Sequence, residues 1–259
     1  MTDGSGKLQL SVAIITKNEE ERLGDCLASV AFADDVVVVD AESDDRTTEI
    51  AETAGARLFV EPWRGFGPQK QFAIDQCRHP WVLVLDADER VPAETSSEIT
   101  ALLSGDPKHA AYSLPRKNFF SGRWIRHAGW WPDRVVRLFR KDCNRMSEHL
   151  VHESLQVGGS VGELVHPIVH LTNRNLRQTM DKVNHYSSAG AEEMFARGET
   201  ASIMKAVARG GWAFLYNYLF RLGFLDGGQG LVIACTDGIN KFLKYAKLHE
   251  MNNRQGGDR

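Results

Sequence analysis

Short apolar runs alternate with segments of helical periodicity through roughly the first third of the chain. Four runs rich in valine, isoleucine and leucine cover residues 8–16, 35–43, 56–60 and 81–88. Apolar runs of this length are typical of parallel strands that are covered on both faces. The pattern therefore predicts four strands of a buried parallel sheet.

Helical patterns separate these strands. The first places apolar residues at i, i+3, i+4 and i+7 on one face, namely Leu23, Cys26, Leu27 and Val30. In the second, Asp44 or Asp45 can cap a helix that Gly55 ends, and a third helix is expected around Phe72 and Cys77. This order predicts an open, mostly parallel α/β sheet with right-handed crossovers and helices on both faces.

The pattern changes after about residue 108. Shorter strands and loops rich in arginine, tryptophan and histidine continue to about residue 173, and the remaining chain is mainly helical. We therefore divide the chain into residues 1–107, residues 108–173, and a helical C-terminal extension over residues 174–259.

Composition and charge exclude several classes of protein. The net charge is -3, with 31 basic and 34 acidic residues, so the sequence does not predict a nucleic-acid partner. The four cysteines are scattered without a CxxC pair, which argues against a disulfide framework and fits a reducing compartment. The N-terminus lacks a signal-peptide pattern, and the apolar stretches 210–220 and 227–236 are shorter than the roughly 20 residues that span a bilayer. We expect a cytoplasmic protein.

Polar residues stand where the predicted strands end. They are Thr16, Lys17 and Asn18 after the first strand, Asp40, Glu42 and Ser43 after the second, and Asp86 and Asp88 after the fourth. Open α/β sheets bind ligands beyond the carboxyl ends of their strands. The usual phosphate loops are missing, since no GxxxxGK[ST] occurs and the nearest approach to GxGxxG has Lys70 in place of its third glycine. A nucleotide would have to be held differently.

Asp86 and Asp88 are separated by one alanine. On an extended chain, residues i and i+2 point to the same side, so both carboxylates can face one ligand. Such a pair suits a hard divalent cation that also takes oxygens from a diphosphate. The alternative is that the two side chains only cap the following turn.

Several blocks of sequence resemble a known family. "SVAIITKNEEERLGDCLASV", "VVVVDAESDDRTTEIAETAGARLF", "GPQKQFAID" and "WVLVLDADER" are similar to the nucleotide-sugar half of the inverting family 2 glycosyltransferases, whose fold is called GT-A. "VHESLQVGGSVGELVHPIVH" and "FRLGFLDGGQGLVIACTDGINKFLKYAKL" resemble bacterial lipopolysaccharide-core glucosyltransferases. The resemblance implies a GT-A domain whose nucleotide-sugar half is residues 1–107 and whose acceptor-binding and catalytic half is residues 108–173.

The resemblance also implies roles for single residues at the donor site. Thr16 and Asp40 would hold the nucleoside, with Asp40 near the base. Lys70 stands where many members have an arginine before an asparagine, although the pair here is Lys70-Gln71. Asp86 would meet the ribose or the metal. The implied cofactor and donor are Mg²⁺ or Mn²⁺ and a UDP-hexose.

Metal binding and catalysis are assigned by the same resemblance. Asp88 and His170 would bind the divalent cation that bridges the diphosphate. Glu153 matches the catalytic base, which would take a proton from the acceptor hydroxyl as that oxygen attacks the anomeric carbon from the face opposite the leaving group. Asp133 is the other candidate base. The histidines do not form a zinc-protease HExxH motif, because Gln156 stands where its second histidine belongs.

Two further groups of side chains allow two interpretations each. The family resemblance implies that the loop with Trp130 and Trp131 closes over the donor, where flat indole rings suit sugar faces; the alternative is that the two side chains pack in the core. Three arginines follow at intervals of three residues, at Arg134, Arg137 and Arg140. They would contact a phosphate of the acceptor, or they form a solvated edge.

The C-terminal extension also has two interpretations. One apolar helical face comprises Trp212, Leu215, Tyr216 and Leu219, and positive charge follows at Lys241, Lys244 and Lys247. These features suit either a helical appendage packed on the catalytic domain or on a second subunit, or attachment in the plane of a membrane surface.

Taken with the resemblance, the sequence predicts a hexosyltransferase that acts on a lipid-linked or lipopolysaccharide-core sugar, peripheral to the inner face of the cytoplasmic membrane. A sugar nucleotidyltransferase and a non-catalytic nucleotide-sugar-binding scaffold are the alternatives. The oligomeric state stays open.

Overall fold

A computed structural model describes residues 8–146, 155–172 and 175–257. The chain forms two compact units, which we describe separately. The sheet unit comprises Met1–Lys117 and Asp133–His170, and the helical unit comprises Asn118–Pro132 and Leu171–Arg259. The three-part division of the sequence stays a prediction, and it did not foresee that residues 118–132 belong with the C-terminal helices.

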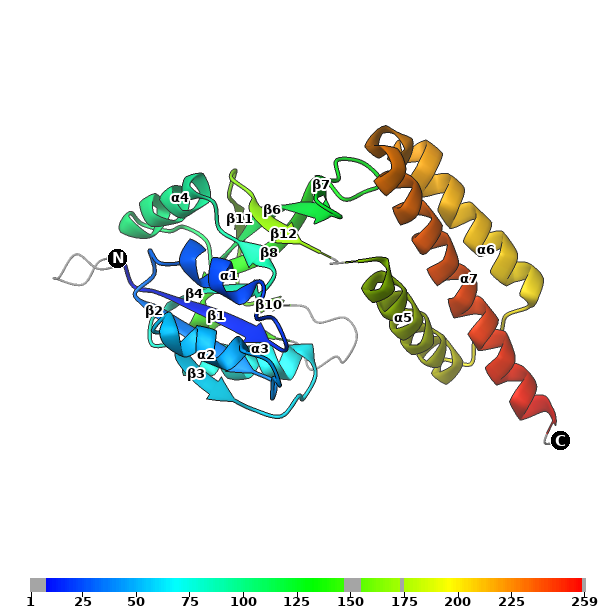
Figure 1. Cartoon of the computed structure of the whole chain (residues 1–259), viewed down its shortest axis with the longest axis horizontal. Coiled ribbons are helices and arrows are strands. Elements are labelled where there is room, and N and C mark those ends of the chain that lie inside the picture. Colours follow the sequence, from blue (N-terminus) through cyan, green and yellow to red (C-terminus); the bar gives the residue numbers. More distant parts are fainter. Residues whose placement is uncertain (1–7, 147–154, 173–174, 258–259) are drawn as a thin grey trace. The chain divides into compact units, whose positions relative to one another are not determined.

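The amino-terminal half of the sheet unit has the predicted order of elements. They are β1 (Leu10–Thr16), α1 (Leu23–Ser29), β2 (Asp35–Asp40), α2 (Thr47–Thr53), β3 (Arg57–Val60), α3 (Phe66–Gln76) and β4 (Trp81–Asp86). The four strands lie in the order β3-β2-β1-β4, and every neighbouring pair is parallel (Figure 1). The α/β prediction is confirmed.

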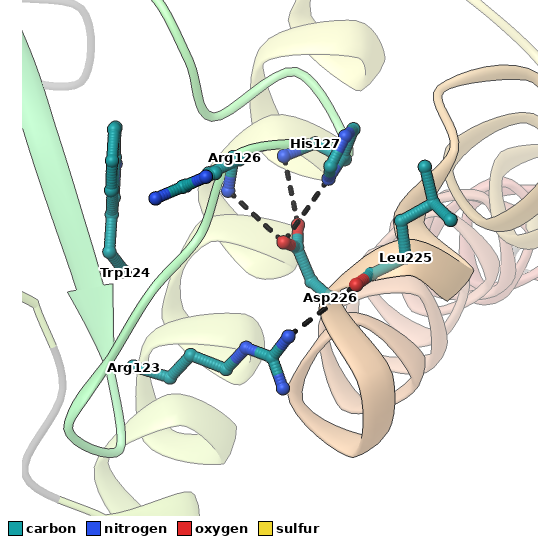
Figure 2. A pocket seen from close by; sticks show the side chains of 6 residues that line it. All are labelled: Arg123, Trp124, Arg126, His127, Leu225 and Asp226. Atoms are coloured by element: carbon teal, nitrogen blue, oxygen red, sulfur yellow. Dashed lines mark hydrogen bonds and ion pairs between the residues drawn. The ribbon is translucent and has the colours of Figure 1, made fainter.

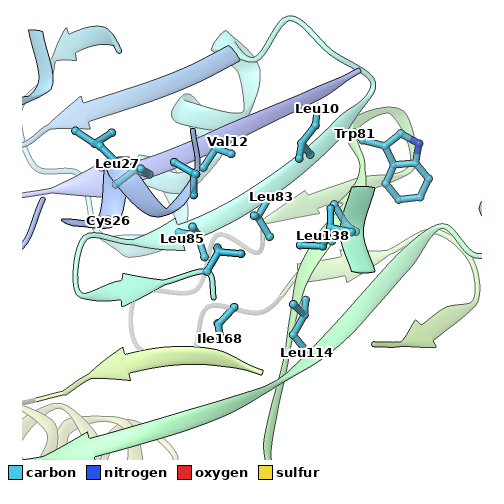
Figure 3. Close-up of a cluster of buried hydrophobic side chains, with 14 of the residues drawn as sticks. Leu10, Val12, Cys26, Leu27, Trp81, Leu83, Leu85, Leu114, Leu138 and Ile168 are labelled. Atoms are coloured by element: carbon cyan, nitrogen blue, oxygen red, sulfur yellow. The ribbon is translucent and has the colours of Figure 1, made fainter. Parts of the chain in front are cut away.

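Both faces of this half sheet are buried, as continuous apolar strands require. Along β1, Leu10, Val12 and Ile14 belong to one apolar cluster (Figure 3), whereas Ala13 and Ile15 belong to the cluster on the opposite face. The register pairs Thr16 with Asp40 and Ile15 with Asp86. The polar ends of three strands therefore lie side by side.

The rest of the sheet is mixed rather than parallel. Its elements are β5 (Glu89–Arg90), α4 (Ala93–Ser104), β6 (Ala111–Phe120), β8 (Asp133–Arg140), η1 (Lys141–Cys143), β11 (Val161–Glu163) and β12 (Ile168–Leu171), with a separate pair formed by β9 (Asn144–Met146) and β10 (Leu155–Val157). Strand β8 is antiparallel to both β4 and β6. A parallel return needs a crossover of a dozen or more residues, usually a helix, and no helix stands between β6 and β8.

The helical unit confirms the predicted C-terminal extension. It contains β7 (Arg123–Trp124), α5 (Leu176–Ala196), α6 (Ile203–Leu215), the π-helical turn η2 (Tyr216–Phe220), the 3₁₀ turn η3 (Gly223–Asp226) and α7 (Gly227–Gly257). Helix α7 packs against both α5 and α6. Among the described residues, no helix combines the length and the apolar content that a bilayer span requires.

Small residues let α6 and α7 approach closely. A Cβ atom added at Gly210 would lie 2.9 Å from the carbonyl oxygen of Gly238, and one added at Gly238 would lie 3.1 Å from that of Gly210. Asn217 adds a hydrogen bond to Asp237, at 2.7 Å. The two glycines therefore let the helix backbones approach closely, and Phe214 and Phe242 pack beside them.

Candidate active site

Two loops are joined at the carboxyl ends of β1 and β2. Asn18 and Glu42 both have φ of 54°, a left-handed conformation that turns each chain sharply after its strand. The backbone N–H of Asn18 donates to Ser43 Oγ at 2.8 Å, and the N–H of Asp44 donates to Asn18 Oδ1 at 3.0 Å. The hydrogen bonds fix the spacing of the two loops.

Thr16 and Asp40 lie next to each other at this edge, where the nucleoside was expected. Asp40 is fully buried and accepts hydrogen bonds from Ser43, through its N–H at 2.8 Å and its hydroxyl at 2.5 Å. The buried hydroxyl of Thr16 has no hydrogen-bond partner within the described part of the chain. An unsatisfied buried hydroxyl costs free energy, which a ligand at this edge would recover.

Asp86 is neutralised by cations of the protein itself. Lys70 Nζ lies 2.9 Å from Oδ1, and an Arg137 guanidinium nitrogen lies 2.7 Å from Oδ2. Burial alone would raise the pKa of Asp86, but Arg137 and Lys70 together hold it well below its usual range. The sequence interpretation gave this task to a metal, whereas the structure gives it to two side chains.

Glu89 and Arg137 form a buried pair that the sequence analysis missed. Glu89 is fully buried, and its Oε1 lies 2.7 Å from Arg137 and 3.4 Å from Arg116. Its Oε2 accepts a hydrogen bond from the N–H of Asp86 at 3.1 Å. Burial would lower the pKa of Arg137, but the charges of Glu89 and Asp86 raise it. Arg137 is thus not part of a solvated edge, and its contact with an acceptor phosphate stays a prediction.

Burial distinguishes Arg137 from the arginines around it. Arg134 and Arg140 are exposed, whereas Arg137, three residues from each, is buried together with Leu138 and Phe139, where both faces of β8 are covered. A period of three suggested a helix-like surface row, but on a strand it alternates between faces. The signal that could have found the pair was the Glu directly after the carboxylate motif.

Asp88 points to different partners from Asp86. Its Oδ2 lies 3.4 Å from His170 Nε2 and 3.5 Å from Arg22. Strand β4 ends at Asp86, and Ala87 and Asp88 form a turn, so the alternation expected for an extended chain does not apply. Strand β12 brings in His170, whose register partner is Glu89 in β5.

The donor set allows a divalent cation at Asp88. Among the described residues, no group of three or more histidine, cysteine or acidic side chains is arranged to hold a metal. Asp88 and His170 nevertheless supply an oxygen and a nitrogen close enough to share one ion, and a diphosphate would supply further oxygens. The residues present therefore fit a metal that binds together with its nucleotide.

The two candidate bases are placed unequally. Glu153 lies outside the described residues, so its role stays a prediction. Asp133, at the start of β8, accepts two hydrogen bonds on Oδ2 from Arg116, at 2.9 Å from Nε and 2.6 Å from a terminal nitrogen. Asp133 would have to give up this ion pair to accept a proton from a hydroxyl.

Trp130 and Trp131 belong to the helical unit. Trp130 packs edge-on against Phe120, with ring centroids 6.2 Å apart, beside a small buried cluster. Trp131 makes a similar edge contact with Trp124 at 5.3 Å. These contacts match the packing interpretation, and contact with the donor stays a prediction.

Acid should destabilise the sheet unit through Asp86. The folded pKa of this carboxyl lies below its unfolded value of about 3.9, so its ion pairs stabilise the protein fully above pH ~4. This stabilisation is lost as pH falls toward the folded pKa. We expect the free energy of unfolding, measured in urea, to be lower at pH ~3 than at pH ~5, with the loss beginning near the unfolded pKa of about 3.9. The decrease should be smaller in Asp86→Asn, and equal slopes for both proteins would contradict this.

Comparisons with known proteins identify relatives of this chain. The family model described as Glycosyl transferase family 2 matches residues 11–155. LpsC of Rhizobium meliloti, a lipopolysaccharide core biosynthesis glycosyltransferase, is 31% identical over 257 residues, which cover 94% of this chain and 93% of that relative. An uncharacterised glycosyltransferase of Rickettsia typhi is 30% identical over 256 residues, which cover 94% of this chain and 88% of that relative. Mannosyl-3-phosphoglycerate synthase from Rubrobacter xylanophilus shares the fold, with a TM-score of 0.50 at 16% identity over 74% of this chain and 75% of that one.

Proposed function

Because this chain belongs to glycosyl transferase family 2, we propose that it transfers a hexose, first of all glucose from UDP-glucose, to a hydroxyl of a lipid-linked or lipopolysaccharide-core sugar. The chain is a glycosyltransferase, and its α/β fold is the GT-A fold that the sequence predicted. The donor, the acceptor, the metal and the inverting course of the reaction are the proposed parts.

The contact between Asp88 and His170 is the observation that carries this proposal. Asp88 lies in the turn beyond the carboxyl end of β4, where an open α/β sheet binds ligands, and His170 of β12 is 3.4 Å away. Thr16 and Asp40 lie at the ends of the neighbouring strands, in register with each other. A nucleoside held by Thr16 and Asp40 would direct its diphosphate along this edge toward Asp88.

The protein's own side chains divide the remaining chemistry. A divalent cation bound at Asp88 and His170 would stabilise the negative charge that develops on the departing diphosphate. Lys70 and Arg137 compensate the charge of Asp86 and hold its side chain in place at this edge of the sheet. Its carboxylate could accept a hydrogen bond from a ribose hydroxyl. Glu153 would take the proton of the acceptor hydroxyl, whose oxygen forms the new bond to the anomeric carbon as the bond to the diphosphate breaks. Attack from the opposite face inverts that carbon.

The acceptor is proposed from the relatives and from chemistry. The Rhizobium relative is named for lipopolysaccharide core biosynthesis, and its alignment covers nearly the whole of both chains. A heptose or another sugar of a lipid-anchored core is therefore the acceptor to test first. Such an acceptor would place the enzyme at the inner face of the cytoplasmic membrane.

A thermal-shift panel tests the donor site. A ligand at about a hundred times its dissociation constant stabilises the folded state by roughly 2.7 kcal/mol. We expect UDP and UDP-hexoses to raise the melting temperature of the wild type in the presence of Mn²⁺. Asp88→Ala should lose this shift, because the substitution removes one of the two side chains proposed to bind the metal. Asp142→Ala removes an exposed ion pair with Arg140 and should keep the shift.

Other results of the panel would redirect the assignment. The same shift in Asp88→Ala as in the wild type would remove Asp88 from the donor site. Release of pyrophosphate from a nucleoside triphosphate and a sugar phosphate would instead indicate a sugar nucleotidyltransferase. Nucleotide binding without turnover of any donor would favour a non-catalytic scaffold.

A further inference from the structure

The outer face of α6 and the two turns after it is apolar. We call this surface the α6 face, and its exposed large side chains are Ile203, Met204, Val207, Trp212, Leu215, Tyr216, Leu219, Phe220, Leu222, Phe224 and Leu225. The exposed fraction reaches 76% at Met204, 66% at Phe220 and 55% at Trp212. The rings of Trp212, Tyr216 and Phe220 contact one another, and an exposed apolar surface of this kind marks an interaction site.

Packing inside the helical unit does not use these side chains. The buried residues of α6 are Ala206 and Gly210, and the crossing with α7 is made by Gly210 and Gly238. Helix α6 therefore turns Ala206, Gly210 and Phe214 toward the unit and most of its other large apolar residues outward, unlike a helix that contributes its apolar stripe to a core. Trp212, Leu215, Tyr216 and Leu219 are exposed, so the helical unit does not bury them, and packing on the catalytic domain or on a second subunit stays a prediction.

The charges on this segment have one sign. Residues 200–225 contain Lys205, Arg209 and Arg221 and no aspartate or glutamate. Arg221 lies 5.1 Å from the ring centroid of Tyr216 on the α6 face, whereas Lys205 and Arg209 lie over the ring of Tyr245 in α7. A second copy on this face would set these like charges against each other, whereas an anionic surface would be attracted by them.

A cationic hollow lies where the α6 face ends. Its volume is about 360 Å³, and it is lined by Arg123, Trp124, Arg126, His127, Leu225 and Asp226 (Figure 2). Asp226 is buried and accepts hydrogen bonds from the backbone N–H groups of Arg126 and His127, at 3.2 and 2.8 Å. The guanidinium of Arg126 stacks 4.2 Å above the ring of Trp124. The exposed guanidinium groups of Arg123 and Arg126 therefore border the hollow. Leu225 lines the hollow and also belongs to the α6 face, so the two features adjoin.

The later lysines do not contribute to this surface as the membrane interpretation supposed. Lys247 Nζ donates hydrogen bonds to Asn184, Ser187 and Ser188 of α5, at 2.7 to 2.9 Å. A side chain added at Gly190 would meet Lys244. Both lysines therefore serve the contact between α5 and α7.

We propose that the α6 face docks in the plane of an anionic lipid bilayer, with Arg123 and Arg126 contacting lipid phosphate groups. The aromatic residues Trp212 and Tyr216 suit the boundary between head groups and acyl chains. The inference rests on the proposed function, since a membrane-bound enzyme reaches a lipid-linked sugar without extracting it.

Vesicle co-sedimentation of the full chain tests this surface. The wild type should bind vesicles of phosphatidylcholine with phosphatidylglycerol, more weakly at high salt, and bind phosphatidylcholine alone much less. The double variant Leu215→Glu/Leu219→Glu should bind anionic vesicles at least about tenfold more weakly, because each carboxylate must leave water and faces anionic lipid. The control Val161→Glu/Val165→Glu adds the same charge at exposed valines of the sheet unit and should bind like the wild type.

The outcomes separate this inference from the proposed function. No binding by the wild type, or equal binding by both double variants, would overturn the membrane surface. Wild-type dimers that the α6-face variant converts to monomers, in sedimentation without lipid, would assign the face to a second copy instead. Inorganic phosphate that prevents vesicle binding at matched ionic strength would indicate a free anion as the ligand of the hollow. Because the UDP-dependent thermal shift reports on the sheet unit, its retention in the α6-face variant shows that the donor site is intact.

Discussion

Glu153→Gln should lower kcat by roughly 10²–10⁴-fold and leave UDP binding unchanged. General-base catalysis contributes about this much, and glutamine has the size of glutamate without a site for the proton. The substitution removes no group that we assign to the donor, so the Mn²⁺-dependent thermal shift with UDP should persist. The measurement is the initial rate of UDP release with a sugar acceptor, at saturating donor.

Asp133→Asn is the matched control, because it makes the same chemical change at the other candidate base. We expect it to retain more activity than Glu153→Gln, since the ion pair with Arg116 ties Asp133 to the sheet. Full activity in Glu153→Gln together with a large loss in Asp133→Asn would reverse the assignment. If both variants lose activity but keep the UDP-dependent thermal shift, the two carboxylates act together.

Arg137→Ala should destabilise the protein by about 3–5 kcal/mol. Removing one partner of a buried ion pair leaves the other charge without compensation, and that cost exceeds the net value of the intact pair. Here two carboxylates lose the same partner, because Arg137 contacts both Asp86 and Glu89 at 2.7 Å. Urea unfolding followed by circular dichroism at pH 7 measures the difference.

Two further variants show whether position, rather than loss of an arginine, causes this effect. Arg140→Ala removes an exposed ion pair with Asp142 on the same strand, and such pairs contribute less than about 1 kcal/mol. Arg137→Met/Glu89→Leu removes a buried pair as a unit and should recover part of the stability lost in Arg137→Ala. A change below about 1 kcal/mol in Arg137→Ala would show that Lys70 and Arg116 suffice to compensate the two carboxylates.

Local periodicity carried most of the fold prediction. The four parallel strands were predicted because each is a continuous apolar run, and the first helix because Leu23, Cys26 and Leu27 share one face. The mixed half of the sheet was not predicted, since β8 inserts beside β4 from more than forty residues away. A sequence pattern reports the period of a strand but not its neighbour.

The candidate site was predicted in part, for a similar reason. The family resemblance singled out Asp88 and His170, and the structure brings them together across more than eighty residues of chain. The partnership of Glu89 and Arg137 escaped prediction because charged residues are usually exposed. The orientation of α6 about its axis was not predicted either, because an amphipathic pattern does not say which face of a helix packs against the protein.

The hydrogen bonds between Asn18, Ser43 and Asp44 have a consequence for how a nucleotide would be received. They hold the loops after β1 and β2 at a fixed separation with groups of the protein alone. The conformational entropy of these loops is therefore lost when the chain folds. Nucleotide binding then carries no further entropic cost for ordering them. This edge of the sheet is preorganised, so donor affinity should follow the contacts made, with little induced fit at the nucleoside.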